Sequence, residues 1–200
     1  MRNSFRAAAF AAAAFGATIA LGQAAPVIAG EGGGLSAERN HLDHAGAGPM
    51  SGPLGVENPD PSQPLEALVE TFGGSETDDA QQDCLASAVY FEARGEPLSG
   101  QLAVADVVLN RVASPRYPGT ICEVVRQPWQ FSFVRRGVIP GADRSAPAWH
   151  RAVAVARIAQ NRIRREVAEN VLWYHADYVR PSWGRRLTRQ EKIGLHIFYS

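Results

Sequence analysis

Apolar positions with helical spacing begin near residue 80 and predict a first helix there. Asp79 precedes this helix, and a Gln stands three residues later, a pairing typical of helix starts. Leu85, Ala88, Val89 and Glu92 then follow at i, i+3, i+4 and i+7, so they share one helical face. The pattern therefore places a carboxyl at the end of an apolar stripe.

A tight corner is predicted directly after this helix, at residues 94–97. Gly95 favours a helix end, and Pro97 biases Glu96 away from helical backbone. A second helix is predicted over Ser99–Val112, and it is apolar nearly all round, as a buried central helix is. Its polar side chains need hydrogen-bond partners if they are buried, and they are Gln101, Asp106 and Asn110.

The rest of the chain predicts one more helix and two strands. Residues 114–147 are rich in proline and irregular, and Pro147 lies in the first turn of a third helix expected to reach about Asn170. Val171–Val179 is rich in β-branched and aromatic residues, so it predicts a strand, and His196–Tyr199 predicts a second. The expected fold is a small α+β domain over residues 80–200, dominated by helices, with a short antiparallel sheet.

The first 79 residues are predicted to form a targeting signal followed by a linker. Arg2 and Arg6 precede an uncharged apolar run, Ala7–Leu21, and small residues follow it in Gly22-Gln23-Ala24. This pattern predicts a secretory signal peptide over 1–24. An uncleaved anchor is the alternative, although the run is shorter than the roughly 20 residues that span a bilayer. We therefore expect an exported protein, periplasmic or bound to the cell wall, with no membrane span after cleavage.

Residues 25–79 predict a disordered acidic linker. Between Gly22 and Pro64 the chain has 9 Gly and 6 Pro in 43 residues, a composition that gains little from burial and loses much entropy on ordering. A small separate domain is the alternative. An amphipathic helix at Pro64–Phe72 is compatible with the apolar spacing and would allow that segment to dock on the main domain.

The formal net charge is +0, but the two parts of the chain carry opposite charges. Residues 1–79 hold 3 Arg against 10 Asp and Glu, whereas residues 80–200 hold 16 Arg and 1 Lys against 10 Asp and Glu. The net charge of zero shows that the whole chain is not a strongly basic nucleic-acid binder. The hydrophobic content of 46% is enough for a core. The chain has two cysteines, Cys84 and Cys122, and export favours a disulfide between them over two free thiols.

Glu92 is the first catalytic candidate. Partial burial at a chain corner disfavours the charged carboxylate and raises its pKa, which suits a general acid near neutral pH. The alternative is a surface residue paired with Arg94, and Glu96 equally well pairs with an Arg or caps a helix. His150, His175 and His196 with Asp177 match no trusted metal signature, so we expect no metal and no cofactor. Nucleotide-binding and serine-hydrolase motifs are absent from the sequence.

Aromatic side chains are frequent in the irregular stretch and the first strand, and they predict a sugar-binding wall. Rings stack on the apolar faces of sugars, and an amide such as that of Gln130 bonds hydroxyls. We expect at least half of these rings to be core instead. They are Trp129, Phe131, Tyr174, Tyr178 and Trp183.

The segment YFEARGEP at 90–97, with GQ at 100–101 and AVADVVLNRV at 103–112, resembles the SleB-type cell wall hydrolases, which include the spore cortex-lytic enzymes. The likeness continues through TIC at 120–122, QFS at 130–132, YHADYV at 174–179 and HIF at 196–198. It implies a lysozyme-like fold related to lytic transglycosylases, with peptidoglycan glycan strands as the partner. Glu92 matches the family's catalytic Glu.

The resemblance implies cleavage between N-acetylmuramic acid and N-acetylglucosamine by a monomeric enzyme. The expected substrate-binding residues are Gln130, Phe131, Ser132, Tyr174 and His175. Because no second carboxyl stands in an obvious catalytic setting, a mechanism with one carboxyl is favoured over the usual pair. An N-acetylmuramoyl-L-alanine amidase and a non-catalytic peptidoglycan-binding module remain as alternatives.

Overall fold

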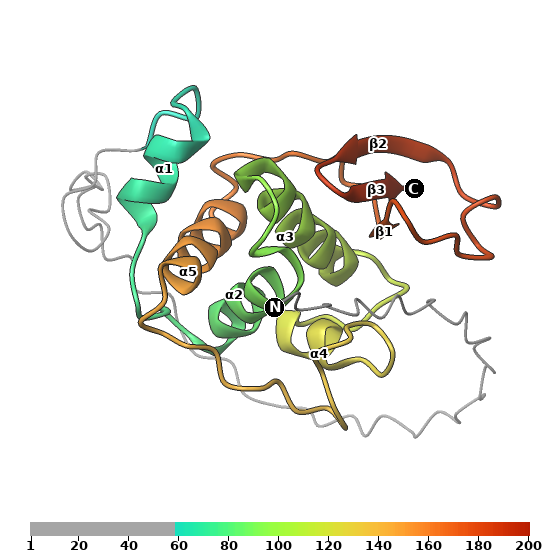
Figure 1. Cartoon of the computed structure of the whole chain (residues 1–200), viewed down its shortest axis with the longest axis horizontal. Coiled ribbons are helices and arrows are strands. Elements are labelled where there is room, and N and C mark those ends of the chain that lie inside the picture. The colour runs from blue at the N-terminus through green and yellow to red at the C-terminus, as the bar shows by residue number, and fades with distance from the viewer. Residues whose placement is uncertain (1–58) are drawn as a thin grey trace, which may run out of the picture. The chain divides into compact units, whose positions relative to one another are not determined.

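The computed structural model describes residues 59–200 (Figure 1). This part of the chain contains five helices and three strands. The predicted signal peptide, 1–24, and the first part of the predicted linker, 25–58, lie outside the described residues.

Two adjacent helices, α2 (Ala80–Ala93) and α3 (Leu98–Ala113), form the corner that the sequence predicts. The Asp79 side chain accepts the N–H of Gln82 at 2.7 Å, which caps α2 as expected. Helix α3 is buried along almost its whole length and packs against α2, α4, α5 and β2 (Figure 1). It is therefore the central helix.

Helix α5 (Pro147–Gln160) is shorter than predicted. The expected extension to Asn170 is wrong. Arg162 has a φ of 54°, a left-handed conformation that ends helical backbone. Beyond it the chain bonds to α3 instead: the Asp106 carboxylate accepts the N–H groups of Glu166 and Val167 at 2.7 and 3.2 Å. These tertiary hydrogen bonds replace the helical ones.

Two further helices flank this group. Helix α1 (Leu65–Phe72) is the amphipathic helix anticipated at Pro64–Phe72 inside the predicted linker, and it packs on α5. Arg157 of α5 donates to the carbonyl oxygen of Phe72 at 3.0 Å. Helix α4 (Ile121–Arg126) interrupts the stretch predicted to be irregular, and the side chain of Thr120 caps it.

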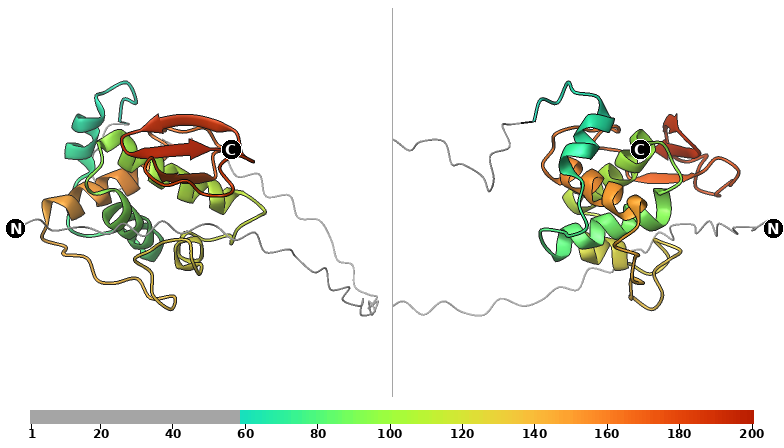
Figure 2. Two further views of the ribbon diagram at one scale, coloured as in Figure 1. Left: turned by 45° about the vertical axis from the view of Figure 1, so that its right-hand side comes forward. Right: turned by 60° about the vertical axis from the view of Figure 1, so that its left-hand side comes forward.

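The three strands form one antiparallel sheet in the order β1-β3-β2, at the edge of the helical body (Figure 2). Strand β1 (Trp173–Ala176) is shorter than the predicted Val171–Val179, and β3 (His196–Tyr199) lies where it was predicted. Strand β2 (Arg189–Ile193) was not predicted, because its side chains are polar and mostly exposed. The expected helix-dominated α+β class with a short antiparallel sheet is confirmed.

The predicted disulfide is present and joins α2 to α4. Cys84 and Cys122 are bonded, with 5.2 Å between their Cα atoms. The main core lies where α2, α3 and α5 meet, around the fully buried Trp149. No helix within residues 59–200 has the length and apolar character needed to cross a membrane.

Candidate active site

Glu92 lies in the last turn of α2, at the end of the apolar stripe predicted from the sequence. Leu85, Ala88 and Val89 of that stripe are completely buried, whereas Glu92 is half-buried. Burial raises the pKa of the Glu92 carboxyl from 4.5 to about 7. The carboxyl can therefore still hold its proton near neutral pH, as a general acid requires.

Two partners oppose this rise and orient the carboxyl. The main-chain N–H and the hydroxyl of Ser132 face Glu92 and lower its pKa, and the positive charge of Arg111 lowers it further. Ser132 comes from the loop after α4 and Arg111 from α3. Three separate segments therefore set the protonation of one side chain, which makes Glu92 the best-supported catalytic candidate.

Arg111 is a site residue that the sequence analysis did not single out. It is 4% exposed, and its guanidinium lies 5.4 Å from the Tyr117 ring centre and 6.0 Å from that of Tyr174. Its Nε donates to the carbonyl oxygen of Leu172 at 2.9 Å, just before β1. An arginine near the end of a helix that is otherwise nearly all apolar was the available signal, because a buried guanidinium needs partners.

Tyr174 of β1 lies beside this pair, as its predicted substrate-binding role requires. Burial and the negative charge of Glu92 raise the pKa of its phenol, while Arg111 lowers it. The phenol therefore stays protonated and can donate a hydrogen bond. Its ring contacts those of His196 and Phe198, with centroids 5.1 and 5.7 Å away, so β3 holds it in place.

The loop residues predicted to bind substrate lie in different environments. Phe131 is 3% exposed and packs on Phe133, with ring centroids 5.5 Å apart, so its ring stabilises the loop from inside. Gln130 is half-buried, and its Nε2 lies 3.4 Å from Oε1 of Gln127. Ser132 is exposed beside Glu92. Of the three, Ser132 and Gln130 have polar groups near the surface of the site.

His175 is held by its own strand and by β3. Its Nε2 lies 2.9 Å from the Tyr199 hydroxyl, and its Nδ1 lies 2.8 Å from the Ala176 carbonyl oxygen. The His175 ring also contacts Trp183, which is itself buried. Among the five aromatic residues predicted as a sugar-binding wall, Trp129 and Tyr178 are 67% and 62% exposed. These two are the rings with faces accessible to a ligand.

Glu96, the second carboxyl of the corner, neither pairs with an arginine nor caps α3. Its Oε2 accepts the N–H of Leu195 at 2.8 Å, from the turn between β2 and β3. This bond ties the corner beyond Glu92 to the sheet. Within residues 59–200, no three His, Cys, Asp or Glu side chains are placed to hold a metal ion.

Comparison with known proteins gives one family. Residues 95–199 match the family described as Cell Wall Hydrolase. A spore cortex-lytic enzyme of Halalkalibacterium halodurans is 34% identical over 135 residues, which are 67% of this chain and 38% of that protein. One of Bacillus subtilis is 51% identical over 55 residues, 28% of this chain and 18% of that protein. The matches therefore span less than half the length of these relatives.

A solved structure has the same fold. The catalytic domain of the germination-specific lytic transglycosylase SleB from Bacillus anthracis superposes with a TM-score of 0.50 at 34% identity. The match covers 60% of this chain and 93% of that domain. The resemblance read from the sequence is confirmed by these comparisons.

Proposed function

Because this chain belongs to the cell wall hydrolase family, we propose that it degrades peptidoglycan by cutting the glycan strand between N-acetylmuramic acid and N-acetylglucosamine. The main support for this proposal is the environment of Glu92. Its carboxyl is half-buried at the end of the apolar face of α2, and its pKa is raised to about 7. A carboxyl in this state can give a proton to a glycosidic oxygen and later take one back.

Glu92 acts alone in the proposed mechanism, because the other carboxyls of residues 80–200 are occupied or exposed. Glycosidases usually need two carboxylates that flank the bond. Here seven of the others bond to side chains or main-chain N–H groups, namely Asp83, Glu96, Asp106, Glu123, Asp143, Glu166 and Asp177. Glu169 pairs with Arg165, and Glu191 is exposed on β2.

The proposed reaction has two proton transfers. Protonated Glu92 first donates to the glycosidic oxygen, and the bond from this oxygen to C1 of the muramic sugar breaks. The resulting carboxylate then removes the proton of the C6 hydroxyl, whose oxygen bonds to C1. The products are a 1,6-anhydromuramic end and a free hydroxyl on the leaving sugar, and Glu92 is protonated again. The description of the Bacillus anthracis domain as a lytic transglycosylase supports this route.

The residues around Glu92 have supporting roles in this proposal. Arg111 and Ser132 favour the carboxylate that forms after the first transfer, because both lower the pKa of Glu92. The Tyr174 phenol, kept protonated, is suited to donate a hydrogen bond to the substrate. Gln130 and His175 complete the proposed contact set from the loop and from β1.

The proposed location is the cell wall, reached by export. Membership of the cell wall hydrolase family supports it, and the disulfide between Cys84 and Cys122 fits an oxidising compartment. The periplasm, the signal peptide over 1–24 and a monomeric enzyme remain parts of the proposal. So does the linker over 25–79, of which helix α1 (Leu65–Phe72) packs on α5.

Mass spectrometry of the soluble products from purified sacculi tests the proposal. We expect muropeptides with 1,6-anhydromuramic ends from the wild type. Products with reducing ends would replace the anhydro route by hydrolysis. Free peptides would mean an amidase, and sacculus binding without soluble products would mean a binding module.

A further inference from the structure

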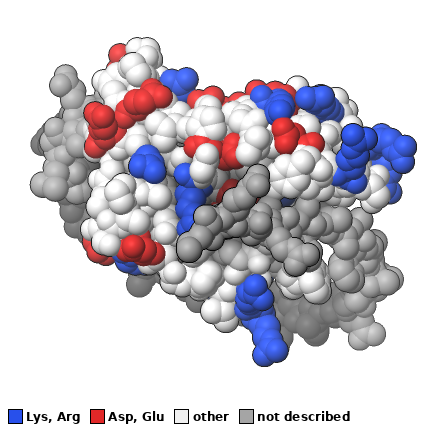
Figure 3. Space-filling view, viewed as in Figure 1, with Lys and Arg blue, Asp and Glu red and all other residues white. Residues whose placement is uncertain are grey.

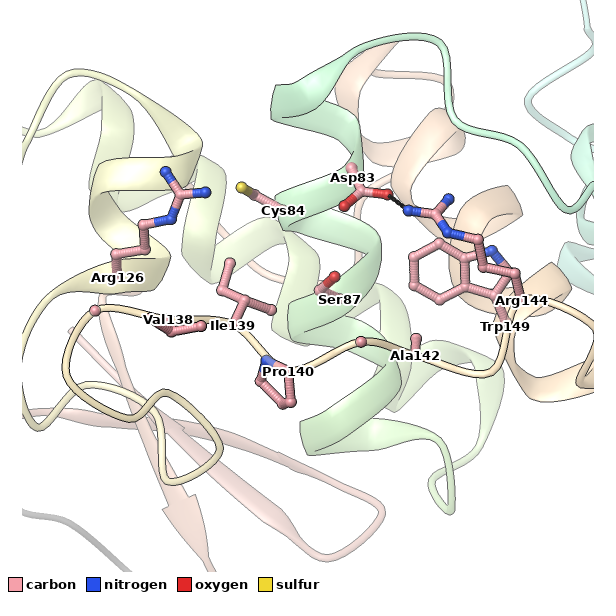
Figure 4. A pocket seen from close by; sticks show the side chains of 12 residues that line it. Asp83, Cys84, Ser87, Arg126, Val138, Ile139, Pro140, Ala142, Arg144 and Trp149 are labelled. Atoms are coloured by element: carbon pink, nitrogen blue, oxygen red, sulfur yellow. Dashed lines mark hydrogen bonds and ion pairs between the residues drawn. The ribbon is translucent and has the colours of Figure 1, made fainter.

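A cavity of about 430 Å³ lies along the other side of α2 (Figure 4). Its floor is formed by Asp83, Cys84 and Ser87 of α2, and its wall by the loop residues 137–142. Arg126, at the end of α4, lies at one end, and Arg144 and Trp149 lie at the other (Figure 4). The volume falls in the range of small-ligand sites.

The two arginines at the ends of this cavity are in different states. Arg144 is neutralised by Asp83 at 2.5 Å, and its guanidinium lies 4.9 Å from the Trp149 ring centre. The Arg126 side chain is exposed, and its guanidinium has neither a hydrogen bond nor an ion pair within residues 59–200. It is therefore an unbalanced cation at the mouth of a cavity, a position that suits a carboxylate ligand.

The wall of the cavity offers main-chain hydrogen-bonding groups. Residues 139–142 have no regular secondary structure. Their C=O groups and the N–H groups of Ile139, Gly141 and Ala142 make no hydrogen bond to another part of the described chain, and Pro140 has no N–H. Just before them, Arg135 and Val138 pair with each other in an isolated bridge. An extended peptide can pair with such a segment through its own backbone, as strands added to exposed edges do.

We propose that this cavity binds the peptide stem of peptidoglycan, with the stem's main chain along residues 139–142 and a carboxylate on Arg126. The proposal rests on the proposed function, because it assigns a second part of the same substrate to this protein. Ser87 adds a hydroxyl on the floor that has no hydrogen-bond partner within residues 59–200.

The cavity and Glu92 lie on different faces of α2, and the loop after α4 links them. Ser87 and Glu92 are five residues apart, about 7.5 Å along the helix axis and about 140° around it. The loop that brings Ser132 to Glu92 continues into the wall at 137–142. A glycan at Glu92 and a peptide at Arg126 would therefore be held by the two parts of one loop.

A binding titration tests the site directly. The ligand is the free stem peptide released from sacculi by an amidase, titrated by calorimetry into the full exported chain and its Arg126→Gln variant. Arg162→Gln is the matched control, because Arg162 is exposed after the end of α5 and does not line the cavity. We expect at least tenfold weaker binding for Arg126→Gln and no change for Arg162→Gln. Equal binding by all three proteins would overturn the proposal.

A second ligand separates the carboxylate from the rest of the peptide. The same peptide with its carboxyl groups converted to amides should bind more weakly to the wild type, and its affinity should not respond to Arg126→Gln. If the amidated peptide binds as tightly as the free acid, the role assigned to Arg126 is wrong.

Cleavage rates distinguish this proposal from the proposed function. The wild type should cut peptide-bearing glycan faster than glycan stripped of peptides, and Arg126→Gln should bring the ratio of the two rates toward one. An unaltered ratio would contradict the peptide site alone. A wild type that cuts neither glycan would contradict the proposed function, while the titration still decides whether the peptide binds.

Discussion

At the scale of single residues, the proposed chemistry depends on the protonation of Glu92. Burial raises its pKa to about 7, and Ser132 and Arg111 hold it from rising further. Because the raised pKa penalises the charged form in the folded state, Glu92 contributes most to stability below pH 4.5, and this contribution is lost as the pH rises toward 7. The cost at higher pH is up to about 3 kcal/mol, since one pKa unit is 1.36 kcal/mol.

The pH dependence of cleavage follows from this environment. For the wild type we expect kcat/KM on glycan strands to fall about tenfold for each pH unit above about 7, as the proton of Glu92 is lost. Ser132→Ala removes the hydroxyl that favours the carboxylate, so the fall should begin at higher pH. A fall at the same pH in both proteins would show that Ser132 does not act on the titrating group.

At the scale of secondary structure, one hydrogen bond ties the corner between α2 and α3 to the turn between β2 and β3. Glu96 accepts the N–H of Leu195, and Gly194 beside it has a φ of 57°. A Cβ on Gly194 would lie 2.0 Å from Oε2 of Glu96 and 3.0 Å from Cδ of Pro97. Only glycine fits both the conformation and the space, so the turn can approach the corner that follows Glu92.

Gly194→Ala should therefore destabilise the protein. We expect a loss of about 2 kcal/mol or more, from the left-handed backbone and the clash, and a melting temperature lower by roughly 5–10 °C. The clash with Glu96 predicts that Gly194→Ala combined with Glu96→Ala costs less than the sum of the two single changes. Additive losses in a thermal melt of the four proteins would mean that the two residues do not share a contact.

The elements that could be predicted from the sequence are those with strong local signals. Helices α2 and α3 follow from apolar spacing, the Asp79 cap and the Gly95–Pro97 corner. Helix α4 was missed, although Thr120 and Glu123 form a capping pair that could have revealed it. The end of α5 could not be predicted, because the Asp106 carboxylate that captures residues 166 and 167 lies some 60 positions earlier.

The residues of the site likewise divide into those with a local sequence signal and those that only tertiary contacts bring together. Glu92 is visible as a carboxyl on an apolar stripe, and Tyr174 and Ser132 were named because of the family resemblance. The partnership of Glu92 with Arg111 joins two helices through the fold, and the link from Glu96 to Leu195 spans 99 positions. Neither has a local pattern, so both needed the three-dimensional structure.

At the scale of the whole molecule, the zero net charge hides two parts of opposite sign. Residues 80–200 carry a formal charge of +7, and residues 1–79 carry −7. In Figure 3 acidic side chains lie over α1, and basic ones gather at the sheet end of the described body. Glu66 and Glu70 of α1 are exposed, and so are Arg185 and Arg186 before β2 and Arg189 in β2.

This separation predicts binding to sacculi that depends on salt. Peptidoglycan stems carry carboxylates, so the basic part should be drawn to its substrate by long-range attraction. Raising the salt from 10 to 150 mM shortens the Debye length from about 30 to about 8 Å and should weaken sedimentation with sacculi. Removing residues 31–58, which include four acidic side chains and one Arg, should strengthen binding at low salt. Equal binding under all these conditions would exclude an electrostatic role.

Glu92→Gln tests whether Glu92 is the general acid, because it removes the titrating proton and keeps the shape of the side chain. The measurement is the rate at which the variant releases soluble glycan fragments from purified sacculi at pH 6, beside the wild type. We predict a loss of at least a thousandfold, with a melting temperature at pH 8 no lower than that of the wild type, since the neutral amide removes a charge disfavoured by burial. Release at the wild-type rate by the folded variant would show that Glu92 is not the general acid.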